Sequence, residues 1–265
     1  MKKEGLTEDQ GPVRNKAVNE HRLNFAVARG ETQKNVNKEI LKFLTKRFEK
    51  KQPSKILDLP CGTMLFASYL KLIFPSAQIT GADIQEPAVE ETRFVKMDLT
   101  KEFSLLTDET YDLITSISGI MMFGNTLSFI SNCSKRLTPE GTFIITNDNS
   151  ATILDKLFFL FLGRFRLFKP VFEDSETLIQ NVSIQELCRL LRTNGLEIET
   201  IKYTSIYVKD LLFFPIAILI YPIQTLYLYY KTKYSTPLVR LMFPFKQYFC
   251  RHYIIVARKV SQVSA

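Results

Sequence analysis

Short apolar runs alternate with segments of helical periodicity between residues 55 and 147, and this alternation restricts the fold more than any other feature of the chain. Strands are expected at 56–59, 77–83, 94–99, 111–117 and 142–147, and helices at 64–74 and 127–137. Alternating strands and helices favour a parallel sheet that helices cover on both faces. The sequence therefore predicts an α/β fold.

The segments on either side extend this pattern. Residues 1–36 are polar and are expected to form a flexible N-terminal segment, with a helix following over 37–48. Ser183 and Glu186 have the spacing of a capping box, so a helix is expected over 183–191. The last two strands are expected at 196–203 and 253–259, and Thr138-Pro139-Glu140-Gly141 predicts a turn before the fifth strand.

Several classes of site are disfavoured by what the sequence lacks. The four cysteines lie far apart without a C-x-x-C pair, so neither a zinc site nor a disulfide framework is expected, and no metal is predicted. Pro60 and Met64 stand where the dinucleotide fingerprint G-x-G-x-x-G needs glycines, and the phosphate-binding motif G-x-x-x-x-G-K-[ST] does not occur. An ordinary NAD enzyme or nucleoside triphosphatase is therefore disfavoured.

The N-terminus has no apolar signal-peptide core, which predicts a cytoplasmic protein.

Acidic residues follow three of the expected strands: Asp58, Asp83 and Asp98. In an open α/β sheet, ligands bind at the carboxyl ends of the strands. Asp58 leads into a tight turn that contains Gly62, where the backbone can approach a ligand closely. Asp83 follows roughly 20 residues later, a position suited to accept hydrogen bonds from two ribose hydroxyls. The three carboxylates together predict a cleft for a ligand that contains a nucleoside.

These motifs resemble those of the class I S-adenosylmethionine-dependent methyltransferases. The resemblance rests on Leu57-Asp58-Leu59-Pro60-Cys61-Gly62-Thr63, Gly81-Ala82-Asp83, Met97-Asp98, Tyr111-Asp112-Leu113-Ile114 and Leu137-Thr138-Pro139-Glu140-Gly141-Thr142. It covers about residues 37–205 and the final strand, and it is strongest to the bacterial branch that includes quinone-biosynthesis and glycan-assembly methyltransferases. The resemblance implies a Rossmann-like seven-stranded sheet and S-adenosylmethionine as the cofactor.

The resemblance also implies roles for the matching residues. Asp58 and the turn after it would line the methionine end of the cofactor, while Asp83 would bind the ribose and Ile84 would lie against the adenine. Asp98 would meet the adenine amine, and residues 116 and 117 would offer backbone carbonyls to the amino group. The cofactor-binding residues expected are Asp58, Leu59, Pro60, Cys61, Gly62, Asp83, Ile84, Asp98, Leu99, Ser116 and Ile117.

Two departures from the family pattern concern the cofactor. Met64 stands where the family usually has glycine, so its side chain either crowds the cofactor or merely begins the helix. The stretch between Asp83 and Phe94 is short and leaves little room for the usual second helix.

No catalytic base is assigned from the sequence. Methyl transfer from a sulfonium is an in-line displacement in which alignment supplies much of the acceleration, and a base is needed only for a poor nucleophile such as an alcohol. His21 either belongs to a segment that folds over the cofactor or is a solvated surface residue. His252 is interpreted as structural or interfacial.

The aromatic run over 157–168, which includes Arg164 and Arg166, is expected to be a substrate lid, a membrane-facing element or core.

An uncharged run from Leu211 to Tyr230 is long enough, as a helix, to cross a bilayer. A single crossing would separate the last strand from its sheet, so an insertion that lies in the membrane interface is expected over 209–249, with a buried hairpin or dimer contact as the alternative. The last 61 residues hold eight basic residues and one acidic residue, which favours an anionic membrane surface as partner. Tyrosines and basic residues are expected at headgroup depth: Tyr221, Tyr227, Tyr229, Tyr230, Lys209, Lys231, Lys233, Arg240 and Lys246.

The sequence therefore predicts a methyltransferase domain over 37–208 and 250–260, which acts on a lipid-like or lipid-linked acceptor at the cytoplasmic face of the membrane. The acceptor would be a quinone precursor or a glycan intermediate. The alternatives are a methyltransferase-fold protein with impaired cofactor binding that serves as a membrane-bound partner, and a soluble methyltransferase for small molecules. The chain lacks the Asn/Asp-Pro-Pro-aromatic motif after the fourth strand, so no nucleic-acid partner is expected.

Overall fold

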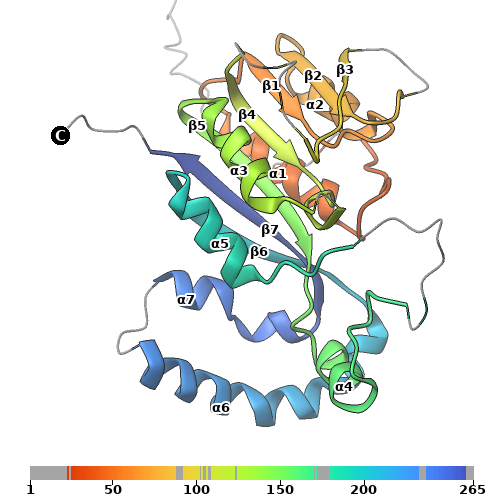
Figure 1. The fold of residues 1–265 in the computed structure, drawn as a ribbon, viewed down its shortest axis with the longest axis vertical. Helices are drawn as coiled ribbons and strands as arrows, with labels where there is room; N and C mark the ends of the chain where they lie inside the picture. The colour runs from red at the N-terminus through yellow and green to blue at the C-terminus, as the bar shows by residue number, and fades with distance from the viewer. Residues whose placement is uncertain are drawn as a thin grey trace, which may run out of the picture.

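A computed structural model of the protein describes residues 23, 25–87, 92–101, 103, 106, 109–122, 124–169, 171, 179–232 and 237–260. Their strands form one sheet in the order β3-β2-β1-β4-β5-β7-β6 (Figure 1). The strands are β1 (Lys55–Asp58), β2 (Gln78–Asp83), β3 (Arg93–Lys96), β4 (Tyr111–Ser116), β5 (Leu137–Asp148), β6 (Leu196–Ile206) and β7 (Cys250–Lys259). The predicted α/β fold with seven strands is confirmed.

The expectation of a parallel sheet is wrong for one strand. The first five strands run parallel, but β7 pairs antiparallel with both β5 and β6. A helical connection joins the end of β6 to the start of β7 at one end of the sheet, so β7 has to run back in the opposite direction (Figure 1). The sheet is therefore mixed.

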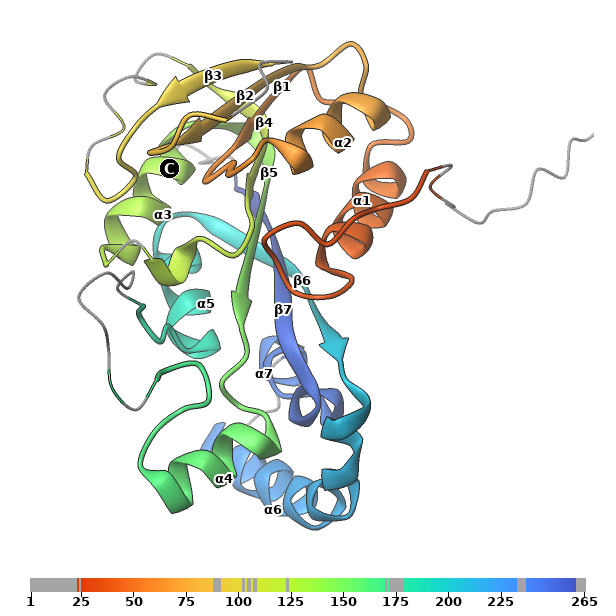
Figure 2. The same ribbon diagram turned by 90° about the vertical axis from the view of Figure 1, so that its right-hand side faces the viewer.

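Helices cover both faces of the sheet, as predicted, with α1 and α2 on one face and α3 and α5 on the other (Figure 2). The helices are α1 (Val36–Arg47), α2 (Leu65–Ile73), α3 (Thr126–Lys135), α4 (Ile153–Leu162), α5 (Ile184–Thr193), α6 (Phe214–Thr232) and α7 (Pro237–Met242). Ser183 caps α5 as expected, because its hydroxyl accepts the amide hydrogen of Glu186 at 3.2 Å. Between β2 and β3 the described residues form no helix.

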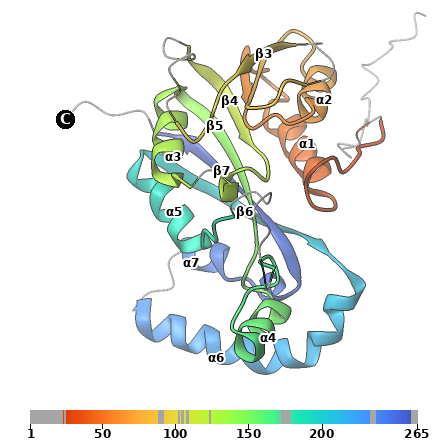
Figure 3. The same cartoon turned by 45° about the vertical axis from the view of Figure 1, so that its right-hand side comes forward.

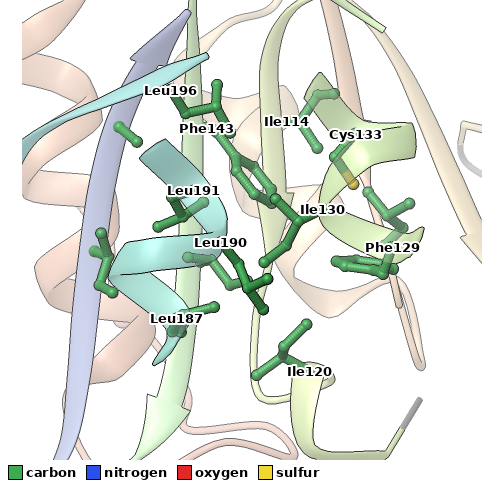
Figure 4. Close-up of a cluster of buried hydrophobic side chains, with 14 of the residues drawn as sticks. Ile114, Ile120, Phe129, Ile130, Cys133, Phe143, Leu187, Leu190, Leu191 and Leu196 are labelled. Atoms are coloured by element: carbon green, nitrogen blue, oxygen red, sulfur yellow. The ribbon is translucent and has the colours of Figure 1, made fainter. Parts of the chain in front are cut away.

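The two faces of the sheet bury separate apolar clusters. Neighbouring residues of β1 point to opposite faces, so Ile56 packs with α1 and α2 while Leu57 packs with α3 and α5. Figure 4 shows part of the second cluster, in which Phe143 lies between side chains of α3 and α5. Both clusters fix the positions at which the strands end.

The turn predicted at 138–141 is a large bulge inside β5. Leu137 pairs with Tyr111 and Thr142 pairs with Leu113, so residues 138–141 are inserted at this point of the ladder. Glu140 has a φ of 65°, a left-handed conformation that allows the insertion to fold back into the strand.

Apolar helices gather beyond the carboxyl end of β5, where α4 and α6 lie side by side (Figures 2 and 3). The short 3-10 helix η3 (Val208–Phe213) leads into α6 and is held to β7 by Arg251, whose guanidinium makes a two-pronged ion pair with Asp210 at 2.6 and 2.5 Å. Met242 of α7 packs into the main core.

The helical segment Val208–Thr232 is long and apolar enough to cross a membrane. Its most apolar stretch of 18 residues has a mean hydropathy of 1.9, and 6% of that stretch is buried. Ala217 is the buried residue of α6. Length and composition alone do not distinguish a membrane helix from other exposed apolar helices.

Candidate active site

Asp83 connects the end of β2 to the turn after β1. Its Oδ2 accepts the amide hydrogen of Gly62 at 2.9 Å, and its Oδ1 accepts that of Gln85 at 3.2 Å. A carboxylate oxygen can accept more than one hydrogen bond, so both oxygens keep capacity for a ligand's hydroxyls. The structure brings Asp83 and Gly62 together as the sequence indicated.

Asp58 is turned into the sheet. Its side chain is buried and accepts the hydroxyl hydrogen of Thr115 on β4 at 2.6 Å. Burial raises the pKa of Asp58 to about 7, the Thr115 hydrogen bond opposes that rise, and the nearby charge of Asp83 adds to it. The charged form of the Asp58 carboxyl is therefore disfavoured in the folded protein.

Backbone hydrogen bonds to the neighbouring strands hold the turn after β1. The amide of Leu59 donates to the carbonyl of Thr115 at 2.9 Å, and that of Cys61 donates to Ala82 at 3.1 Å. Both side chains are buried, so they point away from solvent. Gly62 has a φ of 49°, and a Cβ there would lie 2.8 Å from the Glu31 carboxylate. Only a residue without a side chain leaves this position open.

The adenine end of the predicted cleft has an apolar and an acidic component. Ile84 follows Asp83 directly and is 58% exposed, which leaves its side chain free for a flat ring to pack on. Asp98 accepts from the amide and the hydroxyl of Thr100 at 3.0 and 2.6 Å and pairs with Lys101 at 3.1 Å. The hydrogen bonds from Thr100 are the largest reason that the pKa of Asp98 is lowered. Leu99 is buried and holds this loop to the core.

Residues 116–118 follow β4 at the same edge of the sheet. Ser116 is fully buried, and its hydroxyl has no hydrogen-bond partner among the described residues. Ser118 has a φ of 57° and donates its amide hydrogen to the hydroxyl of Thr146 at 2.8 Å. The buried, unpartnered hydroxyl of Ser116 is an acceptor and donor available at the centre of the predicted cofactor site.

The segment before α1 closes the cleft from above, which the sequence did not reveal residue by residue. Thr32 makes a 2.6 Å hydrogen bond with the hydroxyl of Ser118, and Glu31 reaches the turn at Gly62. The segment is bound to β6, where the Ser205 hydroxyl donates to the carbonyl of Lys34 at 2.7 Å. The residue after β6, Tyr207, donates its hydroxyl hydrogen to the side-chain oxygen of Gln33 at 2.9 Å. His21, which was considered for this covering role, lies outside the described residues.

His252 is neither a surface nor an interface residue: it is fully buried between β5 and β6. Its Nδ1 lies 3.0 Å from Asp148, and its Nε2 lies 3.5 Å from the hydroxyl of Ser118. Asp148 in turn lines a hollow between the end of β5 and the segment after α4, together with Asn149, Phe165 and Phe168. Of the two interpretations that the sequence left open for His252, its complete burial fits a structural role and not an interfacial one.

The residues present fit the cofactor that the motifs imply. Gly62 has a left-handed φ that disfavours a side chain, Asp83 keeps acceptor capacity beside it, and Ile84 offers an exposed apolar surface next to Asp83. The Met64 side chain is buried in the α1–α2 cluster, which favours the interpretation that it begins α2 over the one in which it crowds the cofactor.

Comparison with known proteins supports the same fold. A family model described as a methyltransferase domain matches residues 30–201. Malonyl-[acyl-carrier protein] O-methyltransferases of Bacillus cytotoxicus and Bacillus anthracis are 29% and 28% identical over 151 residues, which is 52% of this chain and 52% and 55% of the relatives. The chain thus spans about half the length of the curated relatives it matches.

Two solved structures share the fold at low sequence identity. A SAM-dependent methyltransferase from Archaeoglobus fulgidus superposes with a TM-score of 0.53 at 14% identity, covering 84% of this chain and 94% of its own. The O-methyltransferase of a trans-AT PKS multienzyme from Brevibacillus brevis, solved with S-adenosyl-L-homocysteine, gives a TM-score of 0.52 at 18% identity, covering 86% and 73%.

Proposed function

The chain belongs to the methyltransferase-domain family, and from that premise we propose that it transfers a methyl group from S-adenosylmethionine to a lipid-like acceptor at a membrane surface. S-adenosylmethionine supplies an electrophilic methyl group on a sulfonium. The chain's own residues would bind and orient it: Asp83 would accept from the ribose hydroxyls, Ile84 would pack on the adenine, and the backbone at 116 and 117 would meet the amino group.

The covering segment contributes by excluding water. Glu31 and Thr32 lie over the turn and over Ser118, and they bring a carboxylate next to the position where the cationic end of the cofactor would lie. Methyl transfer needs alignment above all, and a closed site supplies it.

One observation carries the choice of a lipid-like acceptor: an exposed apolar surface adjoins the hollow at Asp148. We call this surface the α4–α6 surface. On α4, four successive side chains are exposed, and on α6 the exposed apolar residues run along most of the helix: Phe159, Leu160, Phe161, Leu162, Phe214, Ile218, Leu219, Ile223, Leu226, Tyr227 and Tyr230. Soluble monomers rarely leave so much contiguous apolar area uncovered.

The hollow and the α4–α6 surface share α4. Asp155 of α4 lines the hollow, and so do Phe165 and Phe168 just after the helix. An amphipathic acceptor would lay its apolar tail along α4 and direct its polar end past the end of β5, toward residue 118, whose amide bonds Thr146 of β5. This arrangement supports the substrate-lid or membrane-facing interpretation of the segment rather than the core interpretation.

Basic residues border the α4–α6 surface, as an anionic lipid surface requires. Lys209, Lys231 and Lys246 are exposed, and Arg240 is exposed on α7. Lys233 lies outside the described residues. Tyr221 differs from the expectation of headgroup depth, because its ring packs against Phe245 and Tyr248 at centroid distances of 5.2 and 6.3 Å.

The test is methyl transfer to lipid. Purified full-length protein is incubated with methyl-tritiated S-adenosylmethionine and a bacterial total lipid extract, and label is measured in the organic phase. Label in a lipid fraction supports the proposal, and label confined to water-soluble products overturns it in favour of a soluble small-molecule enzyme. Calorimetry with S-adenosylhomocysteine, run in parallel, decides the alternative of a protein with impaired cofactor binding.

The matched relatives favour a second candidate acceptor. Their name specifies malonyl-[acyl-carrier protein], in which the methyl acceptor is a carboxylate. The same assay with malonyl-loaded acyl-carrier protein in place of lipid tests this candidate directly.

A further inference from the structure

Four side chains in successive contact connect the hollow at Asp148 to the segment before α1. Asp148 Oδ1 lies 3.0 Å from His252 Nδ1, His252 Nε2 lies 3.5 Å from Ser118 Oγ, and Ser118 Oγ lies 2.6 Å from Thr32 Oγ1. These residues come from β5, β7, the end of β4 and the segment before α1. In the proposed function Thr32 covers the site and Asp148 lines the hollow, whereas His252 and Ser118 have no role.

The hydrogen-bond partners determine which nitrogen of His252 carries the hydrogen. A carboxylate can only accept, so Nδ1 donates to Asp148 and Nε2 is left with a lone pair directed at the hydroxyl of Ser118. A buried imidazole in this state is prepared to accept a proton at Nε2, and the adjacent carboxylate stabilises the cation that results.

The charges around His252 are few. On β5 its register partner is Asp148, and on β6 it is Thr204, which does not titrate. The neighbouring Arg251 is engaged by Asp210, at 2.6 and 2.5 Å. Asp148 is therefore the charged group that the described structure places against the imidazole.

Ser118 is the residue next to the positions that the proposed function assigns to the cofactor. It follows the cofactor-facing positions 116 and 117 directly, and a φ of 57° is sparsely populated by residues with a side chain. Such strain persists only where the surroundings enforce it, here through the hydrogen bond from its amide to Thr146 at 2.8 Å. The Thr32 hydroxyl shows that Ser118 accommodates a second hydroxyl at 2.6 Å.

We propose that Ser118, His252 and Asp148 form a proton relay that deprotonates a hydroxyl acceptor, an inference that rests on the proposed function. As the acceptor oxygen forms its bond to the methyl carbon, the carbon–sulfur bond breaks and its electron pair stays on sulfur. The acceptor's proton passes to Ser118 Oγ while the proton of Ser118 moves to His252 Nε2. Ser118 is the catalytic residue, and His252 and Asp148 act through it.

The relay specifies the class of acceptor. A carboxylate carries no proton at neutral pH, so a base does not make it a better methyl acceptor. An alcohol or phenol has to lose a proton during methyl transfer, and a base assists that step. The relay therefore favours a hydroxylated lipid over a malonyl thioester.

The first test uses the protein alone. The sequence holds two histidines, so His21→Gln leaves His252 as the only imidazole in a nitrogen-15 NMR spectrum of the full chain. We expect the tautomer with a protonated Nδ1 and an unprotonated Nε2, and a changed Nε2 signal in Ser118→Ala. A neutral imidazole protonated at Nε2 instead, or an Nε2 signal that Ser118→Ala leaves unchanged, overturns the relay.

The second test uses the lipid fraction that wild-type protein labels. His252→Gln and Ser118→Ala are expected to lower kcat by about 100- to 10,000-fold and to flatten its rise with pH, with S-adenosylhomocysteine affinity unchanged. Asp112→Asn, which alters a carboxylate that caps residues 54 and 55, is the matched control and should retain wild-type turnover. Variants that keep both turnover and the wild-type pH profile overturn the relay. If wild-type protein labels no lipid, the proposed function fails, and the imidazole spectrum alone decides whether the relay exists.

Discussion

The thioether of Met64 covers the face of Gly81 so closely that a Cβ at Gly81 would lie 2.2 Å from its sulfur. Met64 holds this position with a φ of 64°, where its relatives in the family usually have glycine. The side chain is directed into the α1–α2 core. The departure from the family motif is thus a packing feature, and Gly81 is the residue that accommodates it.

Met64→Gly separates packing from cofactor binding. The variant loses a buried side chain, which costs about 2–5 kcal/mol, and relieves a left-handed conformation, which regains about 1–2 kcal/mol. We expect a net loss of about 1–3 kcal/mol in the free energy of unfolding, measured by urea denaturation. Affinity for S-adenosylhomocysteine should stay within about twofold, and a tenfold weaker complex would show that the side chain is used in binding.

Asp83→Asn tests the cofactor site. The amide keeps the shape of the carboxylate but loses its charge, so hydrogen bonds to the ribose hydroxyls weaken. Each lost charge-assisted bond lowers affinity for S-adenosylhomocysteine by about 10- to 150-fold, as measured by calorimetry. Asp112→Asn again provides the control. Wild-type affinity in Asp83→Asn would remove Asp83 from the site.

The proximity of Asp83 to Gly62 could be predicted because these residues follow local rules. A carboxylate at a strand end and a glycine in the next turn are readable from a short segment, and the parallel pairing of β1 with β2 then brings Asp83 to Gly62. The engagement of Asp98 with Thr100 is also local, since an aspartate two residues before a threonine commonly bonds its own loop.

The acceptor side could not be predicted in the same way. His252 meets Asp148 only because β7 runs antiparallel to β5 in one particular register, and that register depends on how the preceding helices pack. Thr32 reaches Ser118 only because its segment docks across 86 residues of sequence separation. Neither contact leaves a periodic signal in the chain.

Asp58 predicts a pH dependence of stability. Its pKa in the folded state is about 7, chiefly because the carboxyl is buried, and lies above the ordinary value of 3.8. The folded state therefore binds this proton more tightly, so the contribution is fully favourable below about pH 4 and is lost as the pH rises toward 7. Asp58→Asn should abolish this component in urea denaturation series at pH 5 and pH 8, raising stability at pH 8 relative to wild type. An unchanged difference between the two pH values would contradict the assignment.

The α4–α6 surface predicts membrane binding that point substitutions can remove without unfolding the protein. Leu219 and Ile223 are 71% and 70% exposed, one helical turn apart on α6, so Leu219→Glu with Ile223→Glu should leave the urea midpoint unchanged. Deleting the whole segment would be less informative, because it would remove Met242 from the core and Asp210 from Arg251.

In flotation with vesicles that contain anionic lipid, wild-type protein should rise with the vesicles and the double variant should not. Burying two such side chains is worth about 3–6 kcal/mol, which corresponds to a partition coefficient lowered by more than about 100-fold. Leu72→Glu, at a side chain on α2 that is 62% exposed and far from this surface, is the matched control and should float like wild type. Binding should also weaken in high salt or with purely zwitterionic vesicles, because Lys209 and Lys231 lose their anionic partners. Wild-type protein that stays with the soluble fraction under all of these conditions would instead assign the α4–α6 surface to a protein contact.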